Sequence, residues 1–361
     1  MIKYPYPHNQ IGWRDHRHLA SIDDFSRTEI EHILKTAFFL EPYSGEGNVL
    51  YILQGFILKP VFFEPSSRTQ NSFEAAMLAI GGQNLSPHLT VTSSMEKGET
   101  EKDTITTYAQ YSDFLVVRNA RENSVREFAE MLNDQENRAK IINAGDGSNE
   151  HPTQGLLDLY TIKRELAELD GVTYLLLGDL KYGRTVHSLV LGAQKFNGVK
   201  SVGFPIGGLS LPDKYLHDGY EEHDISEIRQ FLESLPRNSR VAIYATRVQW
   251  ERIAKERGYD LENLGEEQKA QVRTEIYKEL NYQVTEELLE VSPATTTLLH
   301  PLPKGPEIPD SLFYSNNPRV APIRQMRYGL PVRMAVLGLY GKEEAISNID
   351  NIDINDLRFR E

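Results

Sequence analysis

The sequence predicts an α/β protein of two domains, each with a parallel sheet flanked by helices, joined by bridging helices. Short apolar runs alternate with amphipathic helical patterns along the chain, which is typical of βα units. The pattern restarts near residue 171, and 361 residues suffice for two domains. We expect domains over 1–150 and 169–323, a bridging helix over 151–168, and a helix that returns to the first domain, followed by a tail, over 324–361.

Composition limits the class of protein. The content of 40% hydrophobic and 25% charged residues is that of a globular protein with an ordinary core. No apolar run approaches the roughly 20 residues that cross a bilayer, and the first ten residues lack the apolar stretch of a secretory signal. The absence of cysteine excludes disulfides and thiolate chemistry. These features predict a cytoplasmic protein that does not bind membranes.

The formal net charge of −13 argues against binding to nucleic acid. An anionic ligand must therefore be held by a local cluster of basic side chains, against the overall field of the protein. Clustered arginines are for this reason informative in this chain.

The first domain is predicted to begin with a scaffold helix. Residues 21–41 carry Ser26 and Glu29 at capping-box spacing, and their apolar residues share one helix face. Buried strands are expected within residues 55–64, 112–118 and 139–143.

Residues 62–82 predict a strand, a tight turn and a helix that stops at Gly81. The first turn of this helix is rich in hydroxyl groups and contains a guanidinium, and a helix N-terminus readily binds phosphate. The candidate phosphate ligands are Ser66, Ser67, Arg68 and Thr69. The alternative is an ordinary serine cap beside an exposed arginine.

A second candidate segment is 144–154, in which glycines mark a loop and Pro152 suits the first turn of a helix. His151 and Gln154 lie three residues apart at the helix start, so both side chains can face one site. A capping or core histidine is the alternative for His151.

The second domain is predicted to place several candidate ligands at strand ends. Residues 171–196 form a βα unit with Arg184 at the helix start, without the GxGxxG spacing of a dinucleotide site. The strand within 240–249 ends in Arg247 and Gln249, and the one within 295–303 ends in a proline-bracketed loop. Because open parallel sheets bind ligands at their carboxyl ends, we expect the site in the cleft between the domains. Residues 250–290 are predicted to be a charged, helical and mobile surface excursion.

Taken together, these motifs resemble aspartate carbamoyltransferases over nearly the whole chain. The matching segments occur in the family's order: SSRTQ at 66–70, SSMEKGET at 93–100, Arg118, HPTQ at 151–154, DLKYGRTVHS at 179–188, TRVQ at 246–249, HPLP at 300–303 and the closing RQMRYGLPVRMAVL at 324–337. The resemblance implies transfer of a carbamoyl group from carbamoyl phosphate to L-aspartate, an early step of pyrimidine synthesis. It also implies a homotrimer with sites between subunits, a first domain that binds carbamoyl phosphate and a second that binds aspartate. A regulatory chain is a further possible partner.

The resemblance also implies roles for individual residues. The phosphate would be held by Ser66, Ser67, Arg68 and Thr69. The carbonyl oxygen would meet Thr69, Arg118 and His151, and the carbamoyl nitrogen would meet Gln154 and the backbone carbonyls of Pro301 and Leu302. The aspartate carboxylates would be bound by Arg184, Arg247 and Gln249, and Ser93 and Lys97 would reach in from a neighbouring subunit. This chemistry orients two anions and stabilises developing charge, and it requires no metal and no cofactor.

The chain departs from the family pattern at two places. Gln70 replaces an arginine, which puts a supporting ion pair or subunit contact in doubt, and Ser67 replaces threonine but keeps a hydroxyl. The closing helix has Met326, Arg327 and Tyr328 where small or amide residues are more usual.

Three alternatives stay open on the sequence. A carbamoyltransferase for ornithine or a related amine is disfavoured by Pro301, where ornithine enzymes carry a cysteine, and by the arginine pair Arg184 and Arg247. A catalytically silent anion-binding paralogue is suggested only by the two departures. A dehydrogenase of the same fold class lacks support because the glycine fingerprint is missing.

Overall fold

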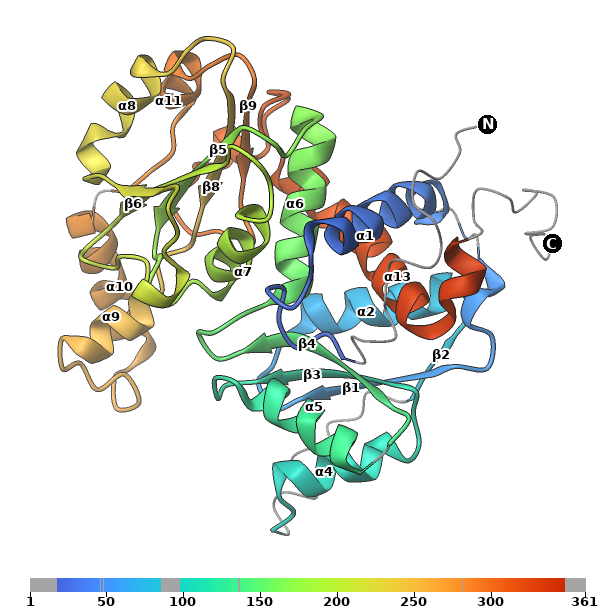
Figure 1. The fold of residues 1–361 in the computed structure, drawn as a ribbon. Helices are drawn as coiled ribbons and strands as arrows, with labels where there is room; N and C mark the ends of the chain where they lie inside the picture. Colours follow the sequence, from blue (N-terminus) through green and yellow to red (C-terminus); the bar gives the residue numbers. More distant parts are fainter. Residues whose placement is uncertain are drawn as a thin grey trace. The chain divides into compact units, whose positions relative to one another are not determined.

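The computed structural model describes residues 18–45, 47, 49–85, 98–135, 137–280 and 282–347 (Figure 1). The chain divides into two compact units. Unit 1 contains the described residues up to Tyr160 and those from Met326 onward, and unit 2 is Thr161–Gln325. Each unit has its own parallel sheet.

Unit 1 is built on a four-stranded sheet in the order β2-β1-β3-β4. All of its strand pairs are parallel. The strands are β1 (Ile57–Phe62), β2 (Gln83–Asn84), β3 (Phe114–Asn119) and β4 (Lys140–Asp146). The helices are α1 (Arg27–Leu40), α2 (Ser67–Ala79), α4 (Glu101–Ala109) and α5 (Ser124–Asp134), together with parts of α6 (Pro152–Leu166) and α13 (Pro322–Ser347).

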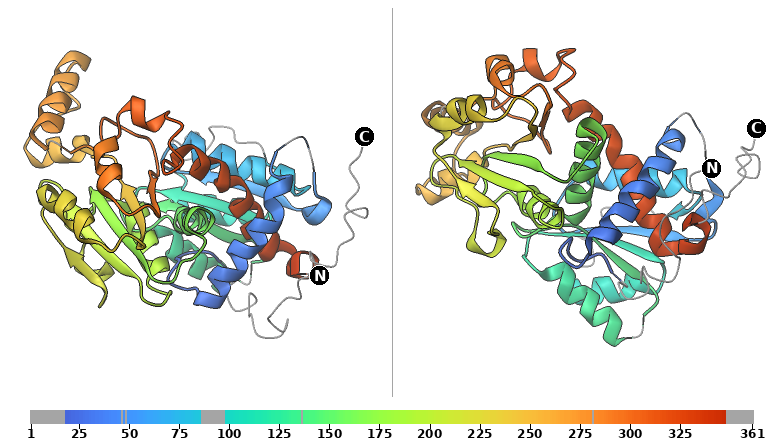
Figure 2. Two further views of the ribbon diagram at one scale, coloured as in Figure 1. Left: turned by 90° about the horizontal axis from the view of Figure 1, so that it is seen from above. Right: turned by 45° about the horizontal axis from the view of Figure 1, so that its top comes forward.

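Alternating side chains of this sheet face different helices. Val61, Leu115, Val117 and Ile141 are fully buried in one cluster with α4 and α5. Figures 1 and 2 show α4 and α5 on this face of the sheet and α2 on the other. The alternation follows from the two-residue repeat of a strand. Because helices cover both faces of the sheet, polar side chains are left at the ends of the strands and at the N-terminus of α2.

Unit 2 is built on a five-stranded parallel sheet in the order β7-β6-β5-β8-β9. The strands are β5 (Val172–Gly178), β6 (Lys200–Pro205), β7 (Tyr220–Glu222), β8 (Arg240–Ala245) and β9 (Thr296–Leu299). The helices of this unit are α7 (Arg184–Ala193), α8 (Ile228–Ser234), α9 (Trp250–Glu256), α10 (Glu266–Leu280), α11 (Glu286–Val291) and α12 (Asp310–Phe313). The register pairs Leu177 with Ala245 and Tyr244 with Leu299, so β5, β8 and β9 end together.

The segment over 250–290, predicted to be helical, forms α9, α10 and the start of α11. Val272 and Ile276 of α10 are buried in the same hydrophobic cluster as Ile243 of β8 and Leu298 of β9. Burial of such side chains contributes about 1.5–3 kcal/mol each. The excursion is therefore attached to the core of unit 2.

The predicted fold class is confirmed, since both sheets are parallel and flanked by helices. The capping box of α1 is also confirmed, with the Glu29 N–H donating to Ser26 Oγ at 3.3 Å and the Ser26 N–H donating to Glu29 Oε2 at 2.7 Å. The helix predicted to start at Pro152 does so. Over the residues that the structure describes, no helix is both long and apolar enough to span a bilayer.

Candidate functional site

The N-terminus of α2 carries the four candidate phosphate ligands. Ser66 occupies the N-cap position in an extended conformation, but its side chain accepts no hydrogen bond from the helix backbone. Its Oγ donates instead to Thr69 Oγ1 at 3.2 Å. The Ser66 hydroxyl therefore does not cap the helix, and the N-terminus of a helix favours an anion. The side-chain cap of the alternative interpretation is therefore not formed, although Arg68 is exposed as that interpretation expects.

Arg118 lies at the same edge of unit 1. It is the last residue but one of β3, and the register pairs it with Phe62 at the end of β1, just before the α2 turn. Its guanidinium forms an ion pair with Glu64 at 3.1 Å and donates to the Ala144 carbonyl at 3.3 Å. Arg118 is only 9% exposed. A buried guanidinium held from two sides is well placed to act as a fixed donor.

His151 and Gln154 follow β4 at the start of α6. Both side chains are buried. The His151 ring has Thr153 Oγ1 at 3.5 Å from Nδ1, and Gln154 donates from Nε2 to Asp158 Oδ1 at 2.8 Å. Asp158 thus fixes the amide orientation of Gln154. The candidate ligands of unit 1 that the structure describes all lie at or just after the carboxyl ends of β1, β3 and β4. Because these strands are parallel neighbours, their carboxyl ends share one edge of the sheet.

Glu150, next to His151, is a buried carboxyl group that the sequence analysis did not single out. Burial raises its pKa to about 7, although hydrogen bonds from the Ser21 hydroxyl and the Ile22 N–H oppose the shift. Its backbone is bridged to Asp146 at the end of β4. Glu150 therefore ties the loop before His151 to the segment around Ser21.

In unit 2, Arg184 is the first residue of α7, directly after the loop that follows β5. The loop is shaped by Asp179, whose Oδ1 accepts from the Tyr182 N–H at 2.9 Å. A Cβ at Gly183 would lie 2.5 Å from the Asp179 carbonyl oxygen, closer than real Cβ contacts come. Glycine at this position lets the chain turn tightly into α7 and so places Arg184.

Arg247 and Gln249 follow β8, the neighbour of β5. Arg247 Nη1 lies 3.0 Å from Glu251 Oε1, one turn further along the chain, and the Arg247 side chain remains 31% exposed. Gln249 donates from Nε2 to the Tyr182 carbonyl at 3.1 Å, which connects its segment to the loop that carries Arg184. The structure therefore brings the segments of the three candidate carboxylate ligands together at the carboxyl ends of β5 and β8.

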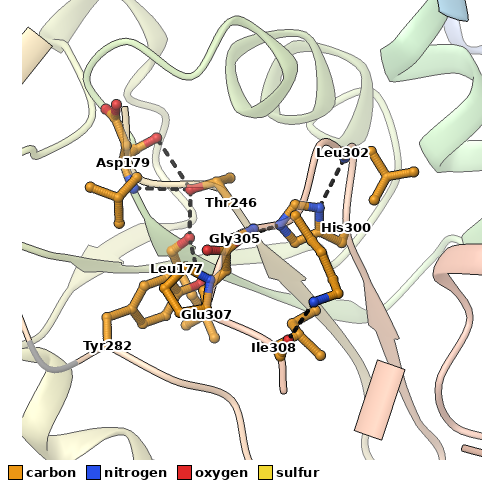
Figure 3. Close-up of polar contacts among 12 residues, drawn as sticks. Leu177, Asp179, Thr246, Tyr282, His300, Leu302, Gly305, Glu307 and Ile308 are labelled. Carbon is orange, nitrogen blue, oxygen red and sulfur yellow. Dashed lines mark hydrogen bonds and ion pairs between the residues drawn. The ribbon is translucent and has the colours of Figure 1, made fainter. Parts of the chain in front are cut away.

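Pro301 and Leu302 lie in the loop after β9. Leu302 has a φ of 61°, in the left-handed region that costs a non-glycine residue about 1–2 kcal/mol. Its N–H donates to His300 Nδ1 at 2.9 Å, and His300 Nε2 lies 2.8 Å from Glu307 Oε1 (Figure 3). The Gly305 N–H also donates to Glu307 Oε1. A buried carboxylate thus holds the loop whose carbonyls are the candidate amide acceptors.

A second group of contacts in Figure 3 joins β5 to β8. Thr246 Oγ1 donates to the Leu177 carbonyl at 2.8 Å and accepts from the Asp179 N–H at 2.9 Å. Tyr282 OH donates to the same Leu177 carbonyl at 3.2 Å. These buried hydrogen bonds hold Asp179, at the start of the loop before Arg184, against Thr246, the residue before Arg247.

Several supporting residues were missed by reasoning from the sequence. Glu64, Asp158, Glu251 and Glu307 each hold a candidate ligand or its loop. Asp158 and Glu251 had a sequence signal, because each lies four residues after the candidate ligand that it holds. Ser93 and Lys97 lie outside the described residues. Within the described ranges, no three or more His, Asp or Glu side chains are grouped as a metal site.

The two departures from the family pattern have local structural partners. Gln70 donates from Nε2 to Glu74 Oε1 at 3.0 Å, one turn along α2. The ring of Tyr328 packs edge-to-face on Tyr160 at 5.4 Å, and Met326 is exposed. Neither departure removes a candidate ligand.

Two units, each with a parallel sheet and candidate anion ligands after its strands, define a class of two-domain α/β proteins. Residues 17–164 match the family described as aspartate/ornithine carbamoyltransferase, carbamoyl-P binding domain. Residues 170–340 match aspartate/ornithine carbamoyltransferase, Asp/Orn binding domain. The chain belongs to the aspartate/ornithine carbamoyltransferase family.

Individual relatives agree with this assignment. The chain is 40% identical over 327 residues to the aspartate carbamoyltransferase catalytic subunit of Thermococcus gammatolerans, covering 90% of this chain and 97% of the relative. A crystal structure of aspartate transcarbamoylase from Trypanosoma cruzi in complex with carbamoyl aspartate and phosphate has a TM-score of 0.76 at 32% identity, covering 94% and 99% of the two chains. The catalytic subunit of aspartate transcarbamoylase from M. jannaschii has a TM-score of 0.74 at 35% identity, covering 91% and 99%.

Proposed function

We propose that this chain transfers the carbamoyl group of carbamoyl phosphate to the amine of L-aspartate, giving N-carbamoyl-L-aspartate and phosphate. The observation that carries the proposal is the sequence and structural similarity to aspartate carbamoyltransferases over about nine-tenths of the chain. Relatives from Trypanosoma cruzi have been crystallised with carbamoyl phosphate and with aspartate. We also propose that the product enters pyrimidine biosynthesis, as the resemblance to aspartate carbamoyltransferases implies.

The residues of unit 1 suit the carbamoyl donor. The uncapped N-terminus of α2 and the hydroxyls of Ser66, Ser67 and Thr69 would bind the phosphate, with Arg68 as the bidentate cation. Arg118 and His151, together with Thr69, would stabilise the negative charge that develops on the carbonyl oxygen. Gln154, held by Asp158, would fix the carbamoyl nitrogen.

The residues of unit 2 suit a dicarboxylate acceptor. Arg184, Arg247 and Gln249 would bind the two carboxylates of aspartate, since guanidinium forks match carboxylate geometry. The carbonyls of Pro301 and Leu302 would accept from the carbamoyl amide. The aspartate amine attacks the carbonyl carbon and the oxygen gains charge. The C–O bond to phosphate then breaks as the carbonyl re-forms, and the proton lost by the amine leaves with the phosphate. No side-chain nucleophile takes part, and the rate comes from orientation and fixed donors.

The assembly and location remain proposals that rest on family resemblance. We propose a homotrimer in the cytoplasm, with Ser93 and Lys97 contributed across a subunit boundary and a regulatory chain as a possible partner. Light scattering on the purified protein measures the subunit number directly. A monomer with full activity would contradict the shared site.

The function is tested by incubating purified protein and carbamoyl phosphate with L-aspartate, and in parallel with L-ornithine. We expect colorimetric detection of N-carbamoyl-aspartate and no citrulline. Product only with ornithine would move the assignment to the other branch of the family. Carbamoyl-phosphate binding by calorimetry without product from either amine would indicate a silent paralogue.

A further inference from the structure

Unit 2 contains a cavity of about 690 Å³ whose lining is strongly one-sided in charge. Four of the lining side chains are cationic, and no aspartate or glutamate is among the twelve lining residues. The four cations are Arg247, Arg273, Lys278 and Lys304. In a chain of formal net charge −13, such a cavity is a local site for anions.

One face of α10 supplies a third of this lining. Arg273, Thr274, Tyr277 and Lys278 follow helical spacing and therefore project from the same side of the helix. The helix is held by the buried Val272 and Ile276, and Tyr277 OH donates to the Val248 carbonyl at 3.2 Å. This hydrogen bond joins α10 to the segment between Arg247 and Gln249.

The two α10 cations differ from the other two in their partners. Arg247 is paired with Glu251, and Lys304 is paired with Asp310. Neither Arg273 nor Lys278 forms a hydrogen bond or an ion pair with any residue that the structure describes.

Three of the four acidic residues of the same helix contact other side chains. Glu266 pairs with Lys269 at 2.9 Å, Glu275 accepts from Gln271 at 3.0 Å, and Glu279 pairs with Arg257 at 2.8 Å. Arg273 and Lys278 therefore line the cavity without a carboxylate paired to either of them among the described residues.

We propose that Arg273 and Lys278 form a capture site that draws the dicarboxylate acceptor into the cavity beside Arg247. The proposal rests on the proposed function, and it assigns a role to α10 that the carbamoyl-transfer chemistry does not use. Cavities lined by charge of one sign concentrate oppositely charged ligands and raise their rate of association, by an amount that falls with ionic strength. A dianionic acceptor approaching an acidic protein gains most from such a site.

The test compares Arg273→Ala/Lys278→Ala with the parent protein at two ionic strengths. At about 20 mM salt, where screening is weak, we expect kcat/KM for aspartate to fall about tenfold, through KM, while turnover at saturating aspartate persists. At about 300 mM salt, where the screening length is short, the two proteins should converge. The KM for carbamoyl phosphate serves as an internal reference.

Two single variants provide matched controls. Lys269→Ala removes one charge from the same helix but not from the cavity. It should change neither kcat/KM for aspartate nor the KM for carbamoyl phosphate. Arg273→Lys keeps the charge and should retain most of the low-salt rate. Calorimetric titration with succinate, a dicarboxylate without the amine, measures capture independently of turnover, and binding should weaken in the double variant.

The outcomes separate this inference from the proposed function. Absence of aspartate turnover in the parent protein would refute the function, and succinate binding would then decide on the capture site alone. Turnover that is equally salt-dependent in the parent and the double variant would overturn the capture site and leave the function standing. An equal loss at both ionic strengths would also overturn it, because that result indicates structural damage.

Discussion

His300 Nε2 lies 2.8 Å from Glu307 Oε1, and both side chains are completely buried. Because His300 Nδ1 accepts from the Leu302 N–H, the ring proton must lie on Nε2 and is donated to the carboxylate. The same carboxylate oxygen accepts from the Gly305 N–H. One buried acid therefore determines the backbone conformation on both sides of Pro303.

Removal of this acid is expected to destabilise the protein and slow the reaction. In Glu307→Ala the buried His300 ring and the half-buried Gly305 N–H lose their acceptor, at a cost of about 1–3 kcal/mol for the buried group. The Leu302 loop then loses its support, and kcat/KM for aspartate should fall with it. Urea unfolding and steady-state kinetics measure the two effects. Glu307→Gln keeps an acceptor oxygen and should be milder; equal damage in both variants would show that the charge, and not the acceptor, is what the loop requires.

Alanine at position 183 is expected to impair aspartate binding. Its Cβ would come within 2.5 Å of the Asp179 carbonyl, so the loop before Arg184 must shift. Overpacking of this kind costs about 1–3 kcal/mol. We expect a raised KM for aspartate and a lower urea midpoint. Gly265→Ala is the matched control, since its nearest neighbouring atom lies 3.7 Å away and its backbone is not left-handed.

Arg68→Ala is expected to abolish useful turnover. Loss of a donor to developing charge reduces kcat by about 10²-fold or more. Calorimetry should show weakened binding of carbamoyl phosphate. Comparable affinity in the variant and the parent protein would contradict the assignment of Arg68 to the phosphate.

Arg247→Ala should act on the acceptor and not on the donor. The substitution removes one carboxylate ligand and also leaves Glu251 without its partner, so that a negative charge faces the acceptor. KM for aspartate should rise by an order of magnitude, while carbamoyl-phosphate affinity stays unchanged. The double variant Arg247→Ala/Glu251→Gln should recover part of the loss if repulsion contributes.

The raised pKa of Glu150 predicts a pH-dependent stability. The group has a reference pKa of 4.5 and a folded pKa of about 7, so the native state binds more protons between these values. Its contribution to stability is therefore greatest at low pH and is lost as pH rises from about 4.5 through 7, by roughly 3 kcal/mol in total. Urea unfolding from pH 5 to 8 measures this slope. Glu150→Gln should flatten it, and an unchanged slope would show that other groups are responsible.

The sequence was sufficient for features with local or periodic causes. The α1 capping box, the start of α6 at Pro152 and the end of α2 before Gly81 each depend on residues within a few positions of one another. Parallel strands were predictable because their apolar runs alternate with helical patterns. The same reasoning placed Arg184, Arg247 and Gln249 after strands that the structure shows to be adjacent.

Features with distant causes could not be predicted in this way. The ion pair between Arg118 and Glu64 joins residues that are far apart in the sequence and that the register of β1 and β3 brings together. The burial that shifts the pKa of Glu150 depends on Ser21 and Ile22, far away in the sequence. The many charged residues of α10 predicted a solvated surface segment, because the sequence alone does not show which face of the helix packs against the core.

The segment over 250–291 leaves the sheet after β8 and rejoins it at β9, while those strands stay in register from Val241 and Thr296 to Tyr244 and Leu299. The charge of its exposed side chains can therefore vary without disturbing strand pairing, while Val272 and Ile276 keep α10 attached to the core. Substitutions in α10 that change the association rate of the acceptor are therefore separable from substitutions that affect bond formation. Adaptation to a different salinity or acceptor concentration could proceed by replacing charged residues on this one helix.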